Sequence, residues 1–415
     1  MKTETDLPAH RRLAVSHFSR LRTPRGQADP FAIYQELRSL GDVVAAPWGG
    51  HIVTRYKLCD AVLRSRDWLE PDARWRRSRA DERRWSASSA QEMSRMLPAL
   101  NPPEHTRVRR SATLLDRGTT KLLQAPVDRI VRRLLVSLGD RLRDGEADLH
   151  ALVSEELPVA TVGYWLGLPT ADFSGLRRLT HDQVFAQELL PSASQLALSD
   201  AATAELRTYF TELVRERRLR PGDDPVSRWI ATWDTMEPDR DRADEAVHSL
   251  ALFVLLAALE TTSTLLSTMT LLLLEHPGRW QRVAARPDLV PAAVEESLRY
   301  DPPTHVITRV ALRDGVLGGV TVRRDEMVHL MVGAAHRDPA VHRRPGLFSL
   351  RRNPVHLAFS GGIHYCLGAP LARLEAQSLL RQLVGRFPGL TLARRPAWAP
   401  RVAFRRMLNL DVALG

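Results

Sequence analysis

Cysteine is scarce in this sequence, because its 415 residues include only Cys59 and Cys366. The two residues lie far apart and match no metal-ligand spacing, which argues against a disulfide scaffold or a cysteine-rich zinc site. This scarcity suits a reducing compartment, so we expect a cytoplasmic protein in which a thiolate can persist.

Lysine is nearly absent as well. Arginine supplies all but three of the 59 basic residues, which outnumber 48 acidic ones and give a net charge of +11. Such a charge indicates either nucleic-acid binding or an acidic protein partner. The arginines are scattered among acidic residues, with no basic arm or aromatic-rich patch. We therefore expect no nucleic-acid partner, and a basic nucleic-acid binder stays open only as an alternative.

The N-terminal segment lacks an apolar core, so it predicts neither a signal peptide nor a membrane anchor. A long apolar run does occur at residues 250–274. It could span a bilayer by its length, but Glu260, Thr261 and Thr262 lie at its centre, where a charge is costly in lipid. We predict a helix buried on all sides within a large protein that has no membrane partner.

Helical periodicity dominates the rest of the chain, which has no repeat and no linker. We predict an N-terminal extension over residues 1–29 and one mainly α domain with a minor β region over residues 30–415. Strands are expected in a hairpin at 42–53, at 307–311 and at 316–322, whereas residues 70–100 are expected to be irregular. Helices are expected at 30–40, after 102–103, and at 121–142, 149–166, 172–189, 198–218, 243 onward, 289–300 and 367–387.

The residues around Cys366 indicate the chemistry most strongly. Glycines at 361, 362 and 368 allow a tight turn and the close approach of a flat ligand. A helix is expected to begin just after the cysteine, and its amides and dipole should lower the pKa of the thiol. A lone cysteine is usually an inert core residue, but a thiolate in this position is a soft ligand suited to iron.

This loop resembles the haem-binding loop of the cytochrome P450 monooxygenases. The resemblance extends from about residue 30 to residue 412 and implies the cytochrome P450 fold, with a long central helix over haem b. It implies that Cys366 is the axial iron ligand and that Phe359 and Gly368 contact the haem. One position departs from the family pattern, since Ser360 stands where glycine is usual.

Further matches concern the periphery and the distal face of the haem. The resemblance implies that buried propionates are bound by charge-assisted partners. It also implies that an acid–alcohol pair on the buried helix delivers protons to bound oxygen, although threonines in helices often only bond back to the preceding turn. The propionate partners would be His105, Arg109, Arg309 and His364, and the distal residues would be Ala257, Ala258, Glu260 and Thr261, with Ala258 where glycine is common.

Glu296 and Arg299 match a family pair of structural residues, which share one helix face at this spacing. Arg351 or Arg352 is expected to complete their network. The substrate pocket is sketched by the resemblance alone, from the tryptophan-rich stretch at 75–96 and the segment 173–196. Its individual candidates are Trp85, Phe253, Val306, Ile307, Met407 and Leu408.

Together the matches imply a monooxygenase that activates O2 and hydroxylates or otherwise oxidises a small organic substrate, expected to be a specialised metabolite. Separate electron donors are implied, namely a ferredoxin or flavodoxin with its reductase, and a monomer is expected. The same chemistry could instead end in C–C, C–N or C–O coupling or ring formation. A peroxide-driven peroxygenase and a non-enzymatic haem carrier or sensor are further alternatives, and the pair Glu260–Thr261 argues against both.

Overall fold

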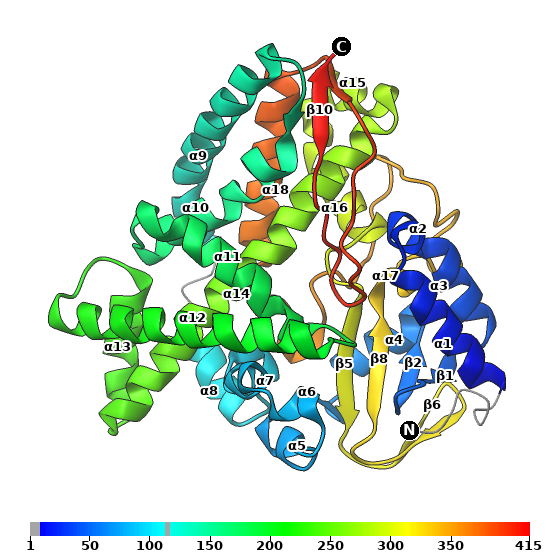
Figure 1. The fold of residues 1–415 in the computed structure, drawn as a ribbon, viewed down its shortest axis with the longest axis vertical. Helices are drawn as coiled ribbons and strands as arrows, with labels where there is room; N and C mark the ends of the chain where they lie inside the picture. The colour runs from blue at the N-terminus through cyan, green and yellow to red at the C-terminus, as the bar shows by residue number, and fades with distance from the viewer. Residues whose placement is uncertain (1–8, 113–116) are drawn as a thin grey trace.

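The structure, a computed structural model, describes residues 9–112 and 117–415. Helices build most of it, and Figure 1 shows the main β-sheet and the N-terminal helices on one side of a helical body. Residues 1–8 of the expected N-terminal extension lie outside the described residues. The rest of the extension is helical, and Phe18 and Leu21 of α1 pack with Ile33 and Leu37 of α3. These helices are α1 (Ala9–Leu21), α2 (Pro24–Ala28) and α3 (Pro30–Ser39).

The predicted buried helix is α14 (Arg240–Leu274), which runs through the middle of the molecule. It begins where the Asp239 side chain accepts hydrogen bonds from the amides of Asp241 and Arg242. By length and hydropathy it could span a membrane, but 78% of its most apolar window is buried inside the protein. Its apolar surface is therefore covered by other helices, as the sequence indicates.

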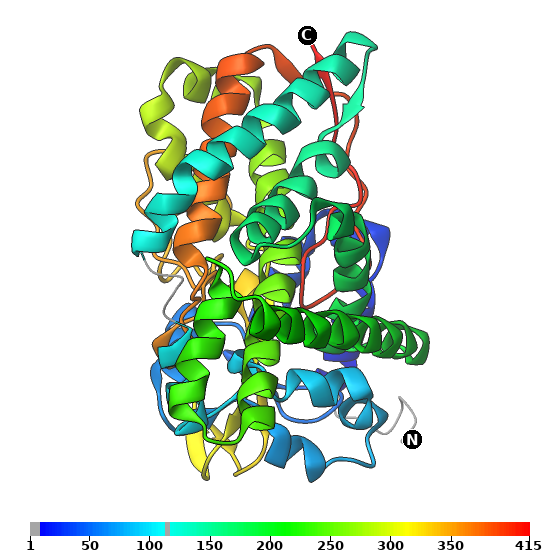
Figure 2. The ribbon, with the colours of Figure 1, turned by 90° about the vertical axis from the view of Figure 1, so that its left-hand side faces the viewer.

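Those helices surround α14 on several sides, and Figure 2 shows α9 and α18 lying next to each other. The helix α12 is preceded by a capping box between Ser192 and Gln195. Two of the helices, α13 and α15, were not expected from the sequence. The surrounding elements are α9 (Arg117–Arg143), the π-helix η4 (His150–Ser154), α10 (Glu156–Leu166), α11 (Phe173–Gln183), α12 (Ala193–Leu219), α13 (Pro225–Met236), α15 (Pro277–Ala285), α16 (Val290–Tyr300) and α18 (Ala369–Arg386).

The main sheet has five strands in the order β1-β2-β8-β5-β3. Its strands β2 and β8 are parallel, and all other neighbours are antiparallel. The hairpin at 42–53 and the strand at 307–311 occur as predicted, whereas β8 was not expected. These strands are β1 (Val43–Ala45), β2 (His51–Val53), β3 (Trp68–Leu69), β5 (Val306–Ala311) and β8 (Met327–Met331).

The single strand predicted at 316–322 is instead two short strands joined by a turn. Gly318 and Gly319 both have positive φ there, which reverses the chain. The other small sheet, with three strands, joins the C-terminal end of the chain to a segment between α9 and η4. The strands of the small sheets are β6 (Gly315–Leu317), β7 (Val320–Val322), β4 (Ala147–Asp148), β9 (Leu390–Leu392) and β10 (Asp411–Leu414).

The segment expected to be irregular contains three short α-helices and one 3-10 helix, with loops or turns between them. Trp75 and Trp85 of this segment are buried against each other, edge to face, with ring centroids 5.2 Å apart. The short elements of the chain are α4 (Tyr56–Arg64), α5 (Ala73–Arg77), α6 (Arg83–Ser86), α7 (Ser88–Met93), η2 (Leu97–Ala99), α8 (Glu104–Ser111), η5 (Thr170–Asp172), η6 (Val184–Gln187), η7 (Pro287–Leu289), α17 (Val332–Ala335) and η8 (Gly362–His364).

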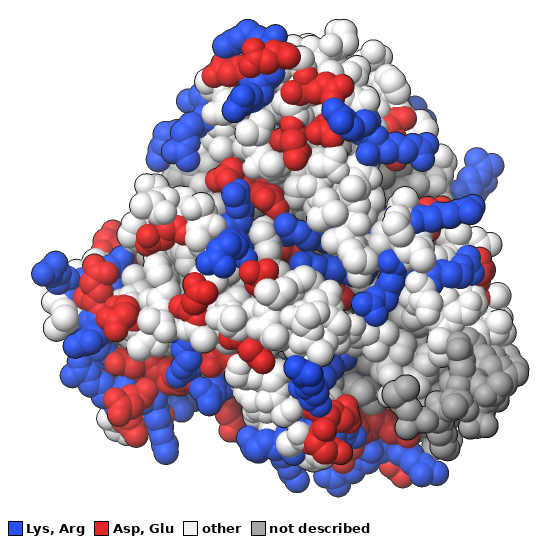
Figure 3. All heavy atoms as spheres, in the orientation of Figure 1, with Lys and Arg blue, Asp and Glu red and all other residues white. Residues whose placement is uncertain are grey.

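Basic and acidic side chains are interspersed over the face shown in Figure 3. This distribution follows from the scattering of arginine among acidic residues in the sequence. It leaves no single-sign surface on that face of the kind that nucleic-acid binding requires.

Candidate active site

A cavity of about 430 Å³ lies between the middle of α14, the loop before α18, strand β5 and the segment that contains α5–α8. Its wall is mainly apolar, as ligand pockets usually are, with a few polar groups. The structure thus brings most of the predicted site residues together around one space. The predicted residues that line it are Trp85, His105, Arg109, Phe253, Ala257, Ala258, Thr261, Val306, Ile307, Arg309, Phe359, His364, Cys366 and Gly368.

Two pocket residues predicted near the C-terminus do not line the cavity. Met407 is buried in the core, and Leu408 is 50% exposed to solvent. Ala403 and Phe404 line the cavity in their place. The reason is the path of the chain: an isolated bridge pairs Thr304 with Phe404, which puts residue 404 beside the start of β5, and the chain then turns away.

Cys366 lies in the loop directly before α18. Its amide donates to the carbonyl of Phe359 over 2.9 Å, which closes the loop. Burial raises the pKa of the thiol, while the amides of Gly368 and Ala369 and the charge of Arg109 lower it. The amides act in the direction that the sequence predicts, but burial outweighs them, so the predicted lowering of the thiol pKa is wrong and the pKa lies above its usual value.

The backbone conformation of this loop requires glycine at position 362 and is unfavourable for the serine at position 360. Gly362 has φ +63°, and a Cβ there would collide with the carbonyl oxygen of Leu63. Ser360 has φ +61°, in the left-handed region that favours glycine. Its buried Oγ has no hydrogen-bond partner among the described residues. The departure from the family pattern at position 360 therefore carries both backbone strain and an unsatisfied hydroxyl.

The four predicted propionate partners form one cluster at the cavity wall. The rings of His105 and His364 lie 4.4 Å apart between centroids. Burial and the charges of Arg309, His105 and Arg109 lower the pKa of His364 to about 2. Nε2 of His105 is buried with no hydrogen-bond partner among the described residues.

Glu70 is the acidic residue that contacts this cluster. Its Oε1 lies 2.5 Å from Nη1 of Arg309, yet burial raises the pKa of Glu70 to about 7. A single carboxyl, whose charged form burial disfavours, offers little compensation for two arginines and an imidazole nitrogen without a partner. The cluster therefore fits a ligand that brings its own carboxylates, as the two propionates of a haem would.

The middle of α14 presents a small-residue surface to the cavity. Ala257 is exposed and Ala258 half-buried, although the residues that flank them on the helix are nearly all buried. The hydroxyl of Thr261 donates to the carbonyl of Ala257 over 2.8 Å. This is the bond to the preceding turn that the sequence analysis gave as the alternative to a role of Thr261 in proton delivery.

Glu260 does not line the cavity, and its carboxylate is held among cations on another side of α14. Its Oε1 lies 2.5 Å from Nη1 of Arg401, and its Oε2 lies 2.8 Å from both Nδ1 of His181 and Nη1 of Arg406. Burial alone would raise the pKa of Glu260, but His181, Arg401 and Arg406 together lower it to about 2. Glu260 is thus a buried carboxylate that stays ionised.

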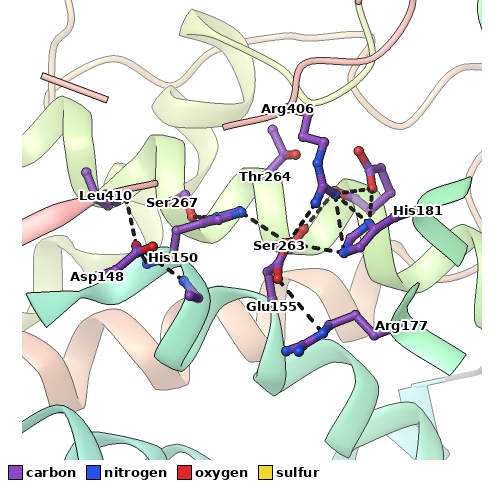
Figure 4. Close-up of polar contacts among 12 residues, drawn as sticks. Asp148, His150, Glu155, Arg177, His181, Ser263, Thr264, Ser267, Arg406 and Leu410 are labelled. Atoms are coloured by element: carbon purple, nitrogen blue, oxygen red, sulfur yellow. Dashed lines mark hydrogen bonds and ion pairs between the residues drawn. The ribbon is translucent and has the colours of Figure 1, made fainter. Parts of the chain in front are cut away.

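Beyond Glu260 the network continues through His181 to Glu155 and Arg406, which Figure 4 shows close together. Nε2 of His181 lies 3.1 Å from Oε1 of Glu155, which also lies 3.0 Å from Nη2 of Arg406. Burial alone would lower the pKa of His181, but its bonds to Glu155 and Glu260 raise it above the usual value. Glu155 in turn contacts His150, at 3.2 Å, and approaches the half-exposed Arg177. A continuous chain of polar groups therefore leads from Glu260 toward the surface.

The predicted structural pair is fully buried. Nη2 of Arg299 donates to Oε1 of Glu296 over 2.6 Å, and the amide of Ser349 donates to the same oxygen over 2.9 Å. Of the two arginines expected to complete the network, Arg352 does so, with Nε 3.2 Å from Glu296, whereas Arg351 is exposed. The pair thus ties α16 to the segment that leads to the cysteine loop.

Comparisons with known proteins agree with this geometry. The family model described as Cytochrome P450 matches residues 193–395. The biotin biosynthesis cytochrome P450 of Bacillus subtilis is 31% identical over 92% of this chain and 96% of its own length. Nocardicin C N-oxygenase of Nocardia uniformis subsp. tsuyamanensis is 35% identical over 86% of this chain and 87% of its own.

Solved structures match over nearly the whole chain. P450BioI, in complex with an acyl carrier protein ligated to hexadec-9Z-enoic acid, superposes with a TM-score of 0.85 at 28% identity, covering 94% of this chain and all of that one. Ligand-free CYP164A2 of Mycobacterium smegmatis has a TM-score of 0.85 at 31% identity, covering 96% of this chain and all of that one.

Proposed function

The chain belongs to the cytochrome P450 family, whose members are monooxygenases, and on that premise we propose that it oxidises a small organic substrate, a specialised metabolite. Relatives with biosynthetic names, in biotin, polyketide and nocardicin pathways, support this class of substrate. We expect the oxidation to end in hydroxylation. The alternative is coupling or ring formation, and analysis of the product distinguishes the two. We place the whole activity in one domain over residues 30–415.

The cofactor is haem b, with Sγ of Cys366 as the iron ligand. When bound, the haem supplies the activation of O2 for attack on the substrate. The residues His105, Arg109, Arg309 and His364, which line the cavity, would hold the propionates, and Phe359 and Gly368 would contact the ring. The unpartnered Nε2 of His105 is the observation that carries this assignment, since a buried polar atom without a partner costs free energy until a ligand supplies one; with the proton on Nε2, a propionate is that ligand.

Protons reach the cavity through α14. The Thr261 hydroxyl, bonded to Ala257 in this structure, turns toward a water in the cavity. Glu260 takes a proton from Nδ1 of His181, 2.8 Å away, and passes it on after its carboxylate leaves Arg401 and Arg406. Glu260 is ionised and can accept a proton, and the bonds of His181 to Glu155 and Glu260 raise the pKa of the ring above its usual value, so both groups suit this transfer.

Electrons come from a separate ferredoxin or flavodoxin with its reductase. Arginines near the cysteine loop support an acidic partner, since Arg110 and Arg351 are exposed and Arg109 donates to the carbonyl of Tyr365. The enzyme works as a cytoplasmic monomer that binds neither nucleic acid nor membrane.

The test of the cofactor is the reduced carbon-monoxide difference spectrum. The wild-type protein is expected to absorb at about 450 nm, the signature of a thiolate ligand. Cys366→Ala should lose this band, whereas Cys59→Ala, which removes a buried cysteine outside the cavity, should keep it. A band that survives in Cys366→Ala contradicts the assignment.

The reaction is tested with the same preparation. Turnover with a ferredoxin and its reductase should exceed turnover with hydrogen peroxide, and equal rates would favour a peroxygenase. If no compound in a metabolite library shifts the ferric Soret band, the result contradicts a monooxygenase and favours a haem carrier or sensor.

A further inference from the structure

Two arginines of the tryptophan-rich segment line the cavity without belonging to the propionate cluster. Arg76 and Arg84 lie against the indole of Trp85, with guanidinium carbons 5.4 and 4.4 Å from the ring centroid. Trp85 is itself held by Trp75. Stacking on an indole fixes each guanidinium plane while leaving donors available, so the arrangement is preorganised.

Arg84 lacks an anion. Among the described residues its Nη1 donates only to the carbonyl of Leu189, over 2.5 Å, and its buried Nε has no partner. No carboxylate of the described chain lies within ion-pair distance of either Arg84 or Arg76. Arg76 instead donates to the carbonyls of Pro71 and Ala90.

The acidic residues around Arg84 are all engaged elsewhere. Glu188 accepts the amides of residues 402, 403 and 404, and Glu82 accepts Nε1 of Trp85 over 3.1 Å. Two acids line the cavity itself. Glu70 is paired with Arg309, and Glu375, in α18, has its pKa raised to about 8 by burial and is therefore neutral at pH 7.

The cavity wall is thus short of negative charge even after a haem is counted. Two propionates match Arg109 and Arg309, and the negative charges of Glu70 and Asp72 act on Arg76, so Arg84 is the cation left over. Burial lowers the pKa of Arg84 to about 10, so it remains a cation at neutral pH. Arg84 is half-buried, and a partly desolvated cation without a counterion is costly; that cost is recovered when a ligand supplies an anion.

We propose that the substrate carries a carboxylate, which forms an ion pair with Arg84 beside Trp85. The rest of the substrate is apolar, because the neighbouring wall is built from apolar side chains. That wall includes Leu97, Phe253, Val254, Val306, Ile307 and Phe404. The proposal rests on the proposed function and narrows its substrate to apolar organic acids.

The experiment compares carboxylic acids with their methyl esters on the haem-loaded enzyme. A library of aryl-alkanoic and medium-chain fatty acids, each paired with its ester, is titrated at pH 7.5 by the Soret shift and by calorimetry. The best acids should bind the wild-type protein about tenfold more tightly than their esters, as a charge-assisted bond implies. In Arg84→Met the acid and the ester should bind within about twofold of each other, and Arg84→Lys should restore part of the preference.

The matched control is Arg83→Leu. Arg83 is adjacent to Arg84 in the chain, but its side chain is exposed and does not line the cavity. The variant removes the same charge, so the preference for acids should persist. The reduced carbon-monoxide spectrum of each variant separates this test from that of the proposed function. A normal spectrum with no loss of acid preference in Arg84→Met overturns the carboxylate proposal alone.

Three other outcomes also overturn it. One is that esters bind the wild-type protein as tightly as acids. Another is that Arg84→Met lowers the affinity for haem, which would assign the arginine to the cofactor. The third is that an acyl chain tethered to a carrier protein binds tightly while its free acid and ester bind alike, which would replace the carboxylate with a thioester substrate.

Discussion

Nδ1 of His181 lies 2.8 Å from Oε2 of Glu260, and Nε2 of the same ring lies 3.1 Å from Glu155. A single imidazole thus bridges the acid on the buried helix and a carboxylate nearer the surface. Nδ1 also lies 2.5 Å from Nη1 of Arg406, which is a donor. The protonation state of the ring therefore decides whether Nδ1 donates to Glu260 or accepts from Arg406, which makes His181 the titrating link of the network.

Replacing His181 should therefore slow proton delivery without disturbing the haem site. In His181→Gln we expect ferredoxin-supported turnover to fall at least about tenfold, in line with the loss of a general acid, with more hydrogen peroxide released per electron. Product and peroxide yields per NADPH are measured side by side. His276→Gln, at an exposed histidine before α15, should leave both yields unchanged.

The stabilising effect of His181 should depend on pH in a defined direction. Its folded-state pKa lies above the unfolded value of 6.5, so its contribution to stability is complete below pH 6.5 and is lost as pH rises through the folded pKa. Urea unfolding of the wild-type protein and of His181→Gln is compared from pH 6 to pH 9. The difference in their free energies of unfolding should shrink as pH rises, and a difference that grows would contradict the assignment.

Restoring glycine at position 360 should stabilise the protein. Ser360→Gly relieves the left-handed backbone and removes a buried hydroxyl without a partner, together worth about 1–2 kcal/mol. Thermal unfolding of the haem-loaded protein measures the gain. Ser360→Ala removes only the hydroxyl and keeps the strain, so its gain should be smaller, and an equal gain would show that the backbone carries none of the effect.

The two adjacent arginines before the cysteine loop should differ in their contribution. Arg352→Gln removes a bond to the buried Glu296 and should cost about 1–3 kcal/mol of unfolding free energy. Arg351→Gln, at an exposed position, should change it by less than about 0.5 kcal/mol. Chemical denaturation followed at the Soret band measures both, and comparable losses would remove Arg352 from the network.

The sequence predicted those features whose signal is local. The apolar run of α14 and the glycine spacing around Cys366 each lie within one stretch of chain, so their structure could be read from one segment. The same holds for Glu296 and Arg299, which are three residues apart. Strand β8 was not predicted, because its residues 327–331 are nearly all buried and therefore do not alternate between buried and exposed positions. A short run of this kind does not distinguish a strand from a helix.

The partners of Glu260 could not be predicted for a different reason. His181 belongs to α11, whereas Arg401 and Arg406 belong to the C-terminal segment, and no spacing connects them with Glu260. Arginine is so common in this chain that its occurrence at positions 401 and 406 does not indicate a partner for a buried carboxylate. The resemblance placed Glu260 at the distal face, but only the packing of α11 and the C-terminal segment against α14 reveals which cations hold it.

The parallel pairing of β2 with β8 has a consequence for biosynthesis. His51 pairs with Val328, so the first strand of the pair leaves the ribosome long before the second. Until then β2 has only the short β1 as a partner, and the sheet cannot close. Such non-local pairing slows folding and leaves strand edges open to other chains. Since Cys366 follows β8, haem can be captured only by a nearly complete polypeptide.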